Sequence, residues 1–125
     1  MAKKIPTVTE TELSILTVLW EKRSATVREI TEAIYRKHSP SSHATVKSLL
    51  ERLAAKGYVA SDRTDFAHQY RAKLDRQSFV GEQLRQLAER HFGGCVTPML
   101  LALVDQARLR KSVRDEIRKK IEELD

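Results

Sequence analysis

The spacing of apolar residues in the first half of the chain predicts three short helices. Leu13, Leu16 and Leu19 recur at helical spacing, so the first helix should bury this face and extend to about residue 22. A second helix should end before Pro40, because a proline disfavours helical backbone in the preceding residue. A third helix should span residues 42–56 after a serine-rich turn. Its apolar stripe comprises Val46, Leu49, Leu50 and Leu53.

The first two helices share the same start signal. Thr9 precedes Glu12 by three residues, and Thr26 precedes Glu29 by three residues. This is the spacing of a capping box, in which the hydroxyl and the carboxylate each accept a hydrogen bond from a free backbone N–H. We therefore expect helices to begin just after Thr9 and Thr26.

After Gly57 the pattern becomes typical of strands. Residues 58–63 and 69–73 can alternate as two strands around a polar tip that contains Phe66. An aromatic residue there could wedge against a ligand or fold back over Tyr70. Three short helices followed by a hairpin predict a winged helix-turn-helix, a mostly helical fold of the α+β class.

The second half of the chain predicts further helices. A longer amphipathic helix should begin at Asp75 and end at the pair Gly93 and Gly94. Another should begin at Thr97 and Pro98, since a proline costs nothing at the first helical position, and a last one should begin near Ser112. We accordingly expect a winged helix-turn-helix DNA-binding domain at 1–73 and a helical dimerisation arm at 74–125.

The arm carries more apolar surface than it can bury alone, above all in the run 99–104. The simplest partner is a second copy of the chain; the alternative is that the arm folds back onto the winged helix as ordinary core. The residues expected at a homodimer interface are Phe92, Met99, Leu100, Leu101, Leu103, Val104, Ile117 and Ile121.

Charge places the expected polyanion-binding surface in the first part. The chain has a net charge of +6. Residues 1–73 hold 13 Lys and Arg against 8 Asp and Glu, a net +5, whereas residues 74–125 hold 10 against 9, a net +1. A basic excess suits DNA, although ribosomal and membrane-surface proteins share it.

Composition excludes several other classes. The single cysteine, Cys95, rules out an intrachain disulfide and a multi-cysteine zinc site, and it fits a reducing cytosol. His38, His43, His68 and His91 lack metal-ligand spacing, so we expect no metal and no cofactor. The sequence has no signal peptide and no apolar run of the roughly 18 residues that a membrane span needs, which predicts a cytoplasmic protein.

The third helix supplies the expected DNA-reading face. In a helix-turn-helix the start of the second helix of the motif enters the major groove, and here the apolar stripe leaves small and basic residues opposite it. These residues are His43, Ala44, Thr45, Lys47 and Ser48. We expect Lys47 to contact a base, because lysine donates to guanine acceptors.

Other cations are candidates for sequence-independent phosphate contacts, although a surface Lys or Arg is often only solvated. Those outside the wing are Arg28, Arg36, Lys37 and Lys56, and those on the wing are Arg63, His68 and Arg71. Arg52 could instead pair with Glu29 or Glu51.

No enzyme motif is present. The chain lacks a phosphate-binding glycine loop and a nucleophile elbow. Ser41, Ser42 and His43 are adjacent at a helix start without a supporting acid, where a capping serine is the better interpretation. The competing function is a winged-helix module that binds protein or RNA, because fold alone does not fix function.

With these residues in view, the chain resembles the BlaI/MecI penicillinase-repressor family, to which the copper-responsive CopY repressors also belong. The resemblance covers nearly the whole length. It rests on the segments 11–13, 18–20 and 26–30, and above all on 45–53 with Lys56-Gly57-Tyr58. It implies a dimeric repressor that binds a dyad-symmetric double-stranded DNA operator through two winged helices.

Three departures from that family limit what the resemblance implies about the operator sequence and its regulation. In the penicillinase repressors a membrane-bound sensor metalloprotease triggers cleavage of an Asn-Phe bond in the dimerisation arm, and the counterpart here is Ala102-Leu103. Ser41-Ser42 stands where many members have Trp-Ser. The Cys-x-Cys motifs of CopY are absent, so the resemblance does not extend to copper sensing.

Overall fold

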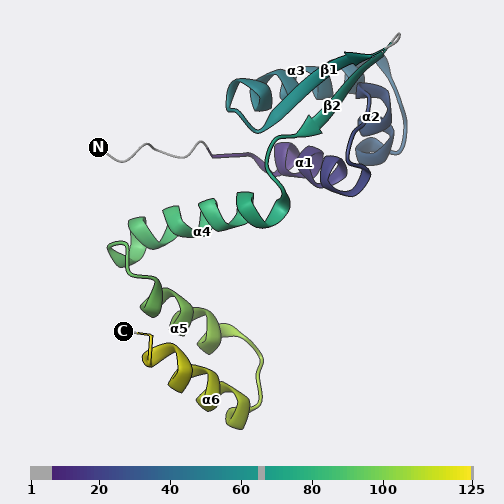
Figure 1. The fold of residues 1–125 in the computed structure, drawn as a ribbon. Helices are drawn as coiled ribbons and strands as arrows, with labels where there is room; N and C mark the ends of the chain where they lie inside the picture. Colours follow the sequence, from purple (N-terminus) through teal and green to yellow (C-terminus); the bar gives the residue numbers. More distant parts are fainter. Residues whose placement is uncertain (1–6, 65–66, 125) are drawn as a thin grey trace. The chain divides into compact units, whose positions relative to one another are not determined.

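The computed structural model describes residues 7–64 and 67–124 and has the predicted element order (Figure 1). The elements are α1 (Glu10–Lys22), α2 (Val27–Tyr35), α3 (Pro40–Ala55), β1 (Val59–Thr64), β2 (Ala67–Ala72), α4 (Arg76–Phe92), α5 (Val96–Gln106) and α6 (Lys111–Glu122). Three helices and an antiparallel hairpin form a winged helix-turn-helix, which confirms the predicted fold class. The chain divides into two compact units between Phe79 and Val80, within α4.

Both predicted capping boxes are present. The backbone N–H of Glu12 donates to the Thr9 hydroxyl at 3.2 Å, and the Thr9 N–H donates to the Glu12 carboxylate at 3.0 Å. At the start of α2 the matching bonds between Thr26 and Glu29 measure 2.9 and 3.1 Å. Each box satisfies two backbone donors that a helix start leaves unpaired, so the first two helices begin where the sequence predicts.

The third helix begins earlier than predicted. Its N-cap is Ser39, whose hydroxyl accepts from the Ser42 N–H at 3.1 Å, and Pro40 is its first residue. The sequence prediction placed Pro40 in the turn and began the helix near Ser42. A proline fits the first helical turn because its φ is already helical and its missing N–H has no intrahelical partner, so the correct start lies two residues upstream.

The core of the first unit joins the three helices to the hairpin. Its fully buried side chains include Ile15, Leu16, Leu19, Ile30, Val46, Leu50 and Leu53. Phe79, in the first turn of α4, packs against Trp20 and Tyr58 with ring centroids 5.5 and 5.1 Å apart. The Trp20 indole N–H donates to the Leu74 carbonyl at 2.8 Å, so the chain leaving the hairpin is fixed to α1.

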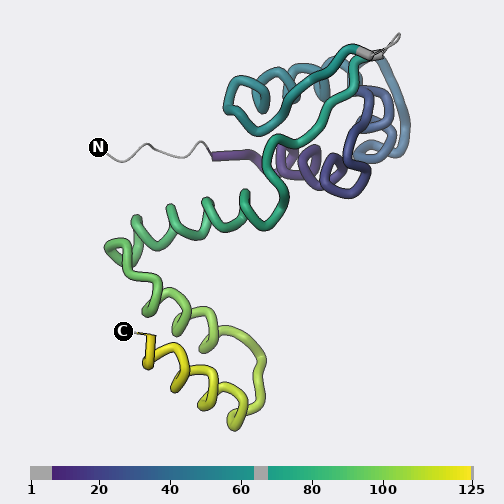
Figure 2. Tube along the Cα trace, in the orientation of Figure 1, coloured from purple at the N-terminus to yellow at the C-terminus, as the bar shows by residue number. Residues whose placement is uncertain are grey.

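The hairpin is held beside the helices on two sides. β1 contacts α3, and β2 contacts α1 and α2 (Figure 2). The backbones of Ala25 and Tyr70 also exchange two hydrogen bonds of 3.0 and 2.8 Å. This isolated bridge places β2 next to the residue that precedes the α2 cap, a long-range contact that the sequence pattern did not indicate.

A buried carboxylate connects α1 to α3. The Glu12 side chain is fully buried, and the Lys56 ammonium lies 2.9 Å from both of its oxygens. Burial alone would raise the pKa of Glu12, but hydrogen bonds from Thr9 and Lys56 outweigh it and hold the pKa below the ordinary 4.5. The Arg52 guanidinium is 3.9 Å from the same carboxylate, so the predicted pairing of Arg52 with Glu29 or Glu51 is wrong.

In the second unit, the helix starts differ from those predicted. α5 begins at Val96, with Cys95 as N-cap, so Thr97 and Pro98 lie inside its first turn. α6 begins at Lys111, which places Ser112 inside the helix rather than at its cap. The predicted end of α4 is confirmed: Gly93 and Gly94 have φ of 59° and 86°, the left-handed backbone that terminates helices.

Val104 of α5 and Ile121 of α6 are buried in a single chain, with 9% and 8% exposure. Both helices contact each other directly, and Arg118 of α6 binds Asp105 of α5. That Val104 and Ile121 face a second copy stays a prediction from the sequence, and in the single chain both side chains are already buried within the arm.

Candidate nucleic-acid interface

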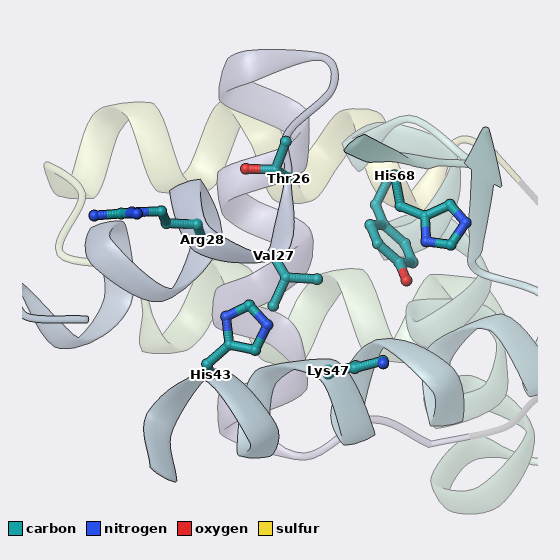
Figure 3. A pocket seen from close by; sticks show the side chains of 7 residues that line it. Thr26, Val27, Arg28, His43, Lys47 and His68 are labelled. Carbon is teal, nitrogen blue, oxygen red and sulfur yellow. The ribbon is translucent and has the colours of Figure 1, made fainter. Parts of the chain in front are cut away.

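A cleft of about 390 Å³ lies between the start of α2, the exposed side of α3 and the inner face of β2 (Figure 3). It is lined by Thr26, Val27, Arg28, His43, Lys47, His68 and Tyr70. Four of these side chains carry nitrogen donors and none is a carboxylate. The cleft therefore has the chemistry of an anion-binding surface.

The start of α2 adds to this character. The capping box satisfies the backbone N–H groups of Thr26 and Glu29 and brings the Glu29 carboxylate to this end. The N–H groups of Val27 and Arg28 have no intrahelical partner, and the helix dipole favours negative charge there. Thr26, Val27 and Arg28 at this end all line the cleft. Arg28 Nε also lies 3.1 Å from the Glu32 carboxylate, but this pair is largely exposed and adds little stability, so Arg28 can turn toward an anion.

The exposed side of α3 carries most of the residues that the sequence picked out. Ala44, Thr45, Lys47 and Ser48 are all exposed, whereas His43 is half-buried. The Thr45 hydroxyl donates to the Ser41 carbonyl at 3.0 Å, so only its acceptor capacity is left for a ligand. Lys47 lies both on this exposed side and at the cleft (Figure 3).

Lys56 does not belong to this surface. Its ammonium binds the buried Glu12 carboxylate and the Thr7 carbonyl, the latter at 2.8 Å, and its side chain is only 23% exposed. Moving it to a phosphate would leave Glu12 as an uncompensated buried charge. That Lys56 binds DNA stays a prediction from the sequence, and this ion pair weighs against it.

The hairpin brings two of the three wing candidates to one face. Arg63 pairs directly with His68 across the strands, and His68 and Tyr70 line the cleft. Arg71 is three residues from His68, and side chains alternate along a strand, so it lies on the opposite face. Phe66 lies outside the described residues.

The sequence pattern did not indicate that His38 contacts His43, a residue of the cleft. Its Nε2 is 2.8 Å from Nδ1 of His43, with the two rings edge-on at 5.0 Å. The two histidines are separated by the helix start at Ser39, where an intervening turn can bring their side chains together. Had the sequence prediction placed the N-cap of α3 at Ser39, it would have indicated that His38 and His43 flank the helix start and can contact each other.

The second unit has an apolar groove of about 290 Å³, lined by Leu84, Leu87, Phe92, Met99, Leu100, Ala102, Leu103 and Gln106. Leu103 and Leu84 are 64% and 44% exposed. Four of the expected interface residues therefore line it, namely Phe92, Met99, Leu100 and Leu103. Leu101 and Ile117 are half-buried and are not part of its lining.

Two features of residues 7–64 and 67–124 bear on other functions. None of the helices there is long and apolar enough to cross a membrane. The same residues contain no group of three or more His, Cys, Asp or Glu side chains that could hold a metal ion.

Comparison with known proteins gives a consistent set of similarities. Residues 8–123 match the family described as penicillinase repressor. The penicillinase repressor of Bacillus licheniformis is 24% identical over 121 residues, which cover 97% of this chain and 94% of that protein.

Two solution structures are also similar. The DNA-binding domain of the repressor BlaI is 25% identical with a TM-score of 0.48, covering 60% of this chain and 90% of that one. The Bacillus licheniformis BlaI monomer in complex with the blaP half-operator is 24% identical with a TM-score of 0.48, covering 61% and 92%.

Proposed function

The chain belongs to the penicillinase repressor family, whose members are transcriptional repressors and not enzymes, and we propose that it represses transcription as a homodimer bound to a dyad-symmetric operator. The observation that carries this proposal is the cleft between α2, α3 and the hairpin, whose lining includes Arg28, His43, Lys47 and His68 and no carboxylate. A duplex has a regular array of phosphates that such a surface can bind.

In this proposal α3 enters the major groove. Ala44 and Ser48 are small and exposed, which permits close approach, and Lys47 can reach guanine acceptors. Arg28 and the start of α2 bind a phosphate on one side of the groove, and Arg63 and His68 of the wing bind the backbone on the other. The phosphate contacts fix the register in which α3 reads bases.

The homodimer forms through the apolar groove of the second unit. A groove with Leu103 64% exposed and lining from α4 and α5 is costly to leave in water. In a dimer with two-fold symmetry, the same surface patch of each chain forms the interface. One interface would therefore cover the grooves of both chains. Two α3 helices would then reach two half-sites.

Release from the operator is a separate question. Ala102 and Leu103, which stand at the family's cleavage bond, both lie within α5 and line the groove. Cleavage there by a membrane-bound sensor metalloprotease or by a protease that it activates would require α5 to open locally, because a helical peptide bond does not fit an extended protease site. Such cleavage would remove part of the groove and so separate the dimer.

The test is binding of the purified chain to the promoter region upstream of its own gene, measured by fluorescence anisotropy over 50 to 300 mM salt. A promoter fragment should bind tighter than a scrambled duplex, with affinity falling steeply as salt rises. Equal affinity for both duplexes at every salt concentration would contradict the repressor function. Preferential binding of single-stranded RNA would support the competing function, a winged-helix module that binds protein or RNA.

A further inference from the structure

We propose that His38 is a positioning residue that fixes His43 as a hydrogen-bond donor to a DNA phosphate, an inference that rests on the proposed function. The bond between His38 Nε2 and His43 Nδ1, at 2.8 Å, is part-buried. It crosses the start of α3, and His43 lines the cleft from the first turns of that helix (Figure 3).

The atoms involved restrict the proton positions. A neutral imidazole has one N–H and one acceptor nitrogen. A bond from Nε2 of one ring to Nδ1 of the other therefore allows two neutral arrangements. Either both rings carry hydrogen on Nε2 and His38 donates, or both carry it on Nδ1 and His43 donates.

Only the first arrangement suits a phosphate. With His38 donating, His43 carries its hydrogen on Nε2, the nitrogen on the far side of the ring from His38, and phosphate oxygens accept hydrogen bonds. The second arrangement would present a lone pair to the phosphate and repel it. His38 thus specifies which nitrogen of His43 is the donor, as the partner of a histidine's other nitrogen generally does.

The cleft around His43 already carries cations. The charged or titratable side chains that line it with His43 are Arg28 from α2, Lys47 from α3, and His68 and Tyr70 from β2. In the first arrangement His43 adds a neutral hydrogen-bond donor to this surface.

The histidine tautomers give a readout that needs no DNA. In the full chain labelled with ¹⁵N-histidine, long-range ¹H–¹⁵N correlation spectra distinguish Nε2–H from Nδ1–H rings, and the spectrum of His43→Gln assigns the His43 signals. We expect His43 to be the Nε2–H form in the wild type and a mixture in His38→Ala. A His43 ring in the Nδ1–H form, or unchanged in His38→Ala, would overturn the proposal.

Binding to duplex DNA supplies the second readout. His38→Ala should weaken binding on the order of two- to ten-fold on every duplex, as expected for one lost hydrogen bond. His38→Gln should restore it, because the glutamine amide N–H can donate to Nδ1. The salt dependence should stay that of the wild type, since a neutral donor releases no counterion. A salt slope reduced by about one would show that His43 binds as a cation and would overturn the proposal.

Unfolding midpoints of both variants control for damage to the neighbouring Ser39 cap. If the wild type binds no DNA, the proposed function itself fails, whatever the tautomer. If the wild type binds and His38→Ala binds equally well, this inference alone fails.

Discussion

At the scale of single residues, Lys47 within α3 and Lys56 at its C-cap have different environments. Lys47 is exposed at the cleft, whereas Lys56 neutralises the buried Glu12 carboxylate. The sequence could not separate them, because the partner of Lys56 lies 44 positions earlier in the chain. Helical periodicity identifies the exposed side of a helix, but it does not identify a long-range ion pair at its end.

Replacing Glu12 by Gln should lower the free energy of unfolding by about 2–4 kcal/mol at pH 7, because it leaves the partly buried Lys56 without its anion. The pKa of Glu12 is lowered in the fold. Its stabilisation is therefore complete well above 4.5 and is lost as the pH falls from 4.5 through the lowered value. Urea unfolding at pH 7 and pH 3 should show a large gap between wild type and Glu12→Gln that narrows at pH 3. A gap equally wide at both pH values would contradict this assignment.

Arg23, at the end of α1, has φ 71° and ψ −46°, a backbone conformation that is rare and strained for a residue with a side chain. Arg23→Gly should raise the stability by about 0.5–1 kcal/mol, because glycine adopts this conformation without the Cβ clash. Arg23→Ala is the matched control, since it removes the same charge but keeps the Cβ. Equal thermal unfolding midpoints for the two variants would show that strain is not the cause.

At the scale of elements, capping and terminating residues predicted the start or end of most helices. The prediction failed at a proline, because proline can either follow a helix or begin one. The Thr-x-x-Glu pairs placed the starts of α1 and α2, and the glycine pair placed the end of α4. The prediction places Pro40 in the turn between two helices, although a proline is also well suited to begin a helix. That error shifted the start of α3 and hid the contact between His38 and His43.

On α3, Lys47→Ala should weaken binding to the best duplex by about 1–3 kcal/mol and relax the preference at one base position. Lys73→Ala, which removes an exposed charge that does not line the cleft, is the matched control. Anisotropy titrations against duplexes with single base changes measure both effects. A uniform loss on all duplexes would make Lys47 a phosphate contact instead.

At the scale of the whole molecule, the two units have different surfaces. The first unit has the cleft lined by cations, and the second unit has the apolar groove. The sequence predicted both surfaces, because the positive net charge of residues 1–73 and the apolar run 99–104 can be read from it. It could not predict which apolar residues the arm buries by itself. Val104 and Ile121 are buried in the single chain, whereas Leu103 is 64% exposed.

Leu103→Asp should therefore separate the proposed dimer without unfolding the arm. The substituted residue is exposed in the single chain, so the charge costs little there, but it would be buried between two copies. Val113→Asp, on α6 and 41% exposed outside the groove lining, is the matched control. Sedimentation velocity should give a dimer for Val113→Asp and a monomer for Leu103→Asp. A dimeric Leu103→Asp would move the interface elsewhere.

The central claim is that two copies of this chain read DNA together, and selection from a library of random duplexes tests it most directly. The full chain is mixed with the library, and the bound duplexes are sequenced over successive rounds. We predict enrichment of a dyad-symmetric motif whose half-sites lie one helical turn, about 10 base pairs, or a multiple of it apart. Enrichment of no motif would contradict the claim that the chain is a sequence-specific repressor, and enrichment of an isolated half-site would contradict binding as a dimer.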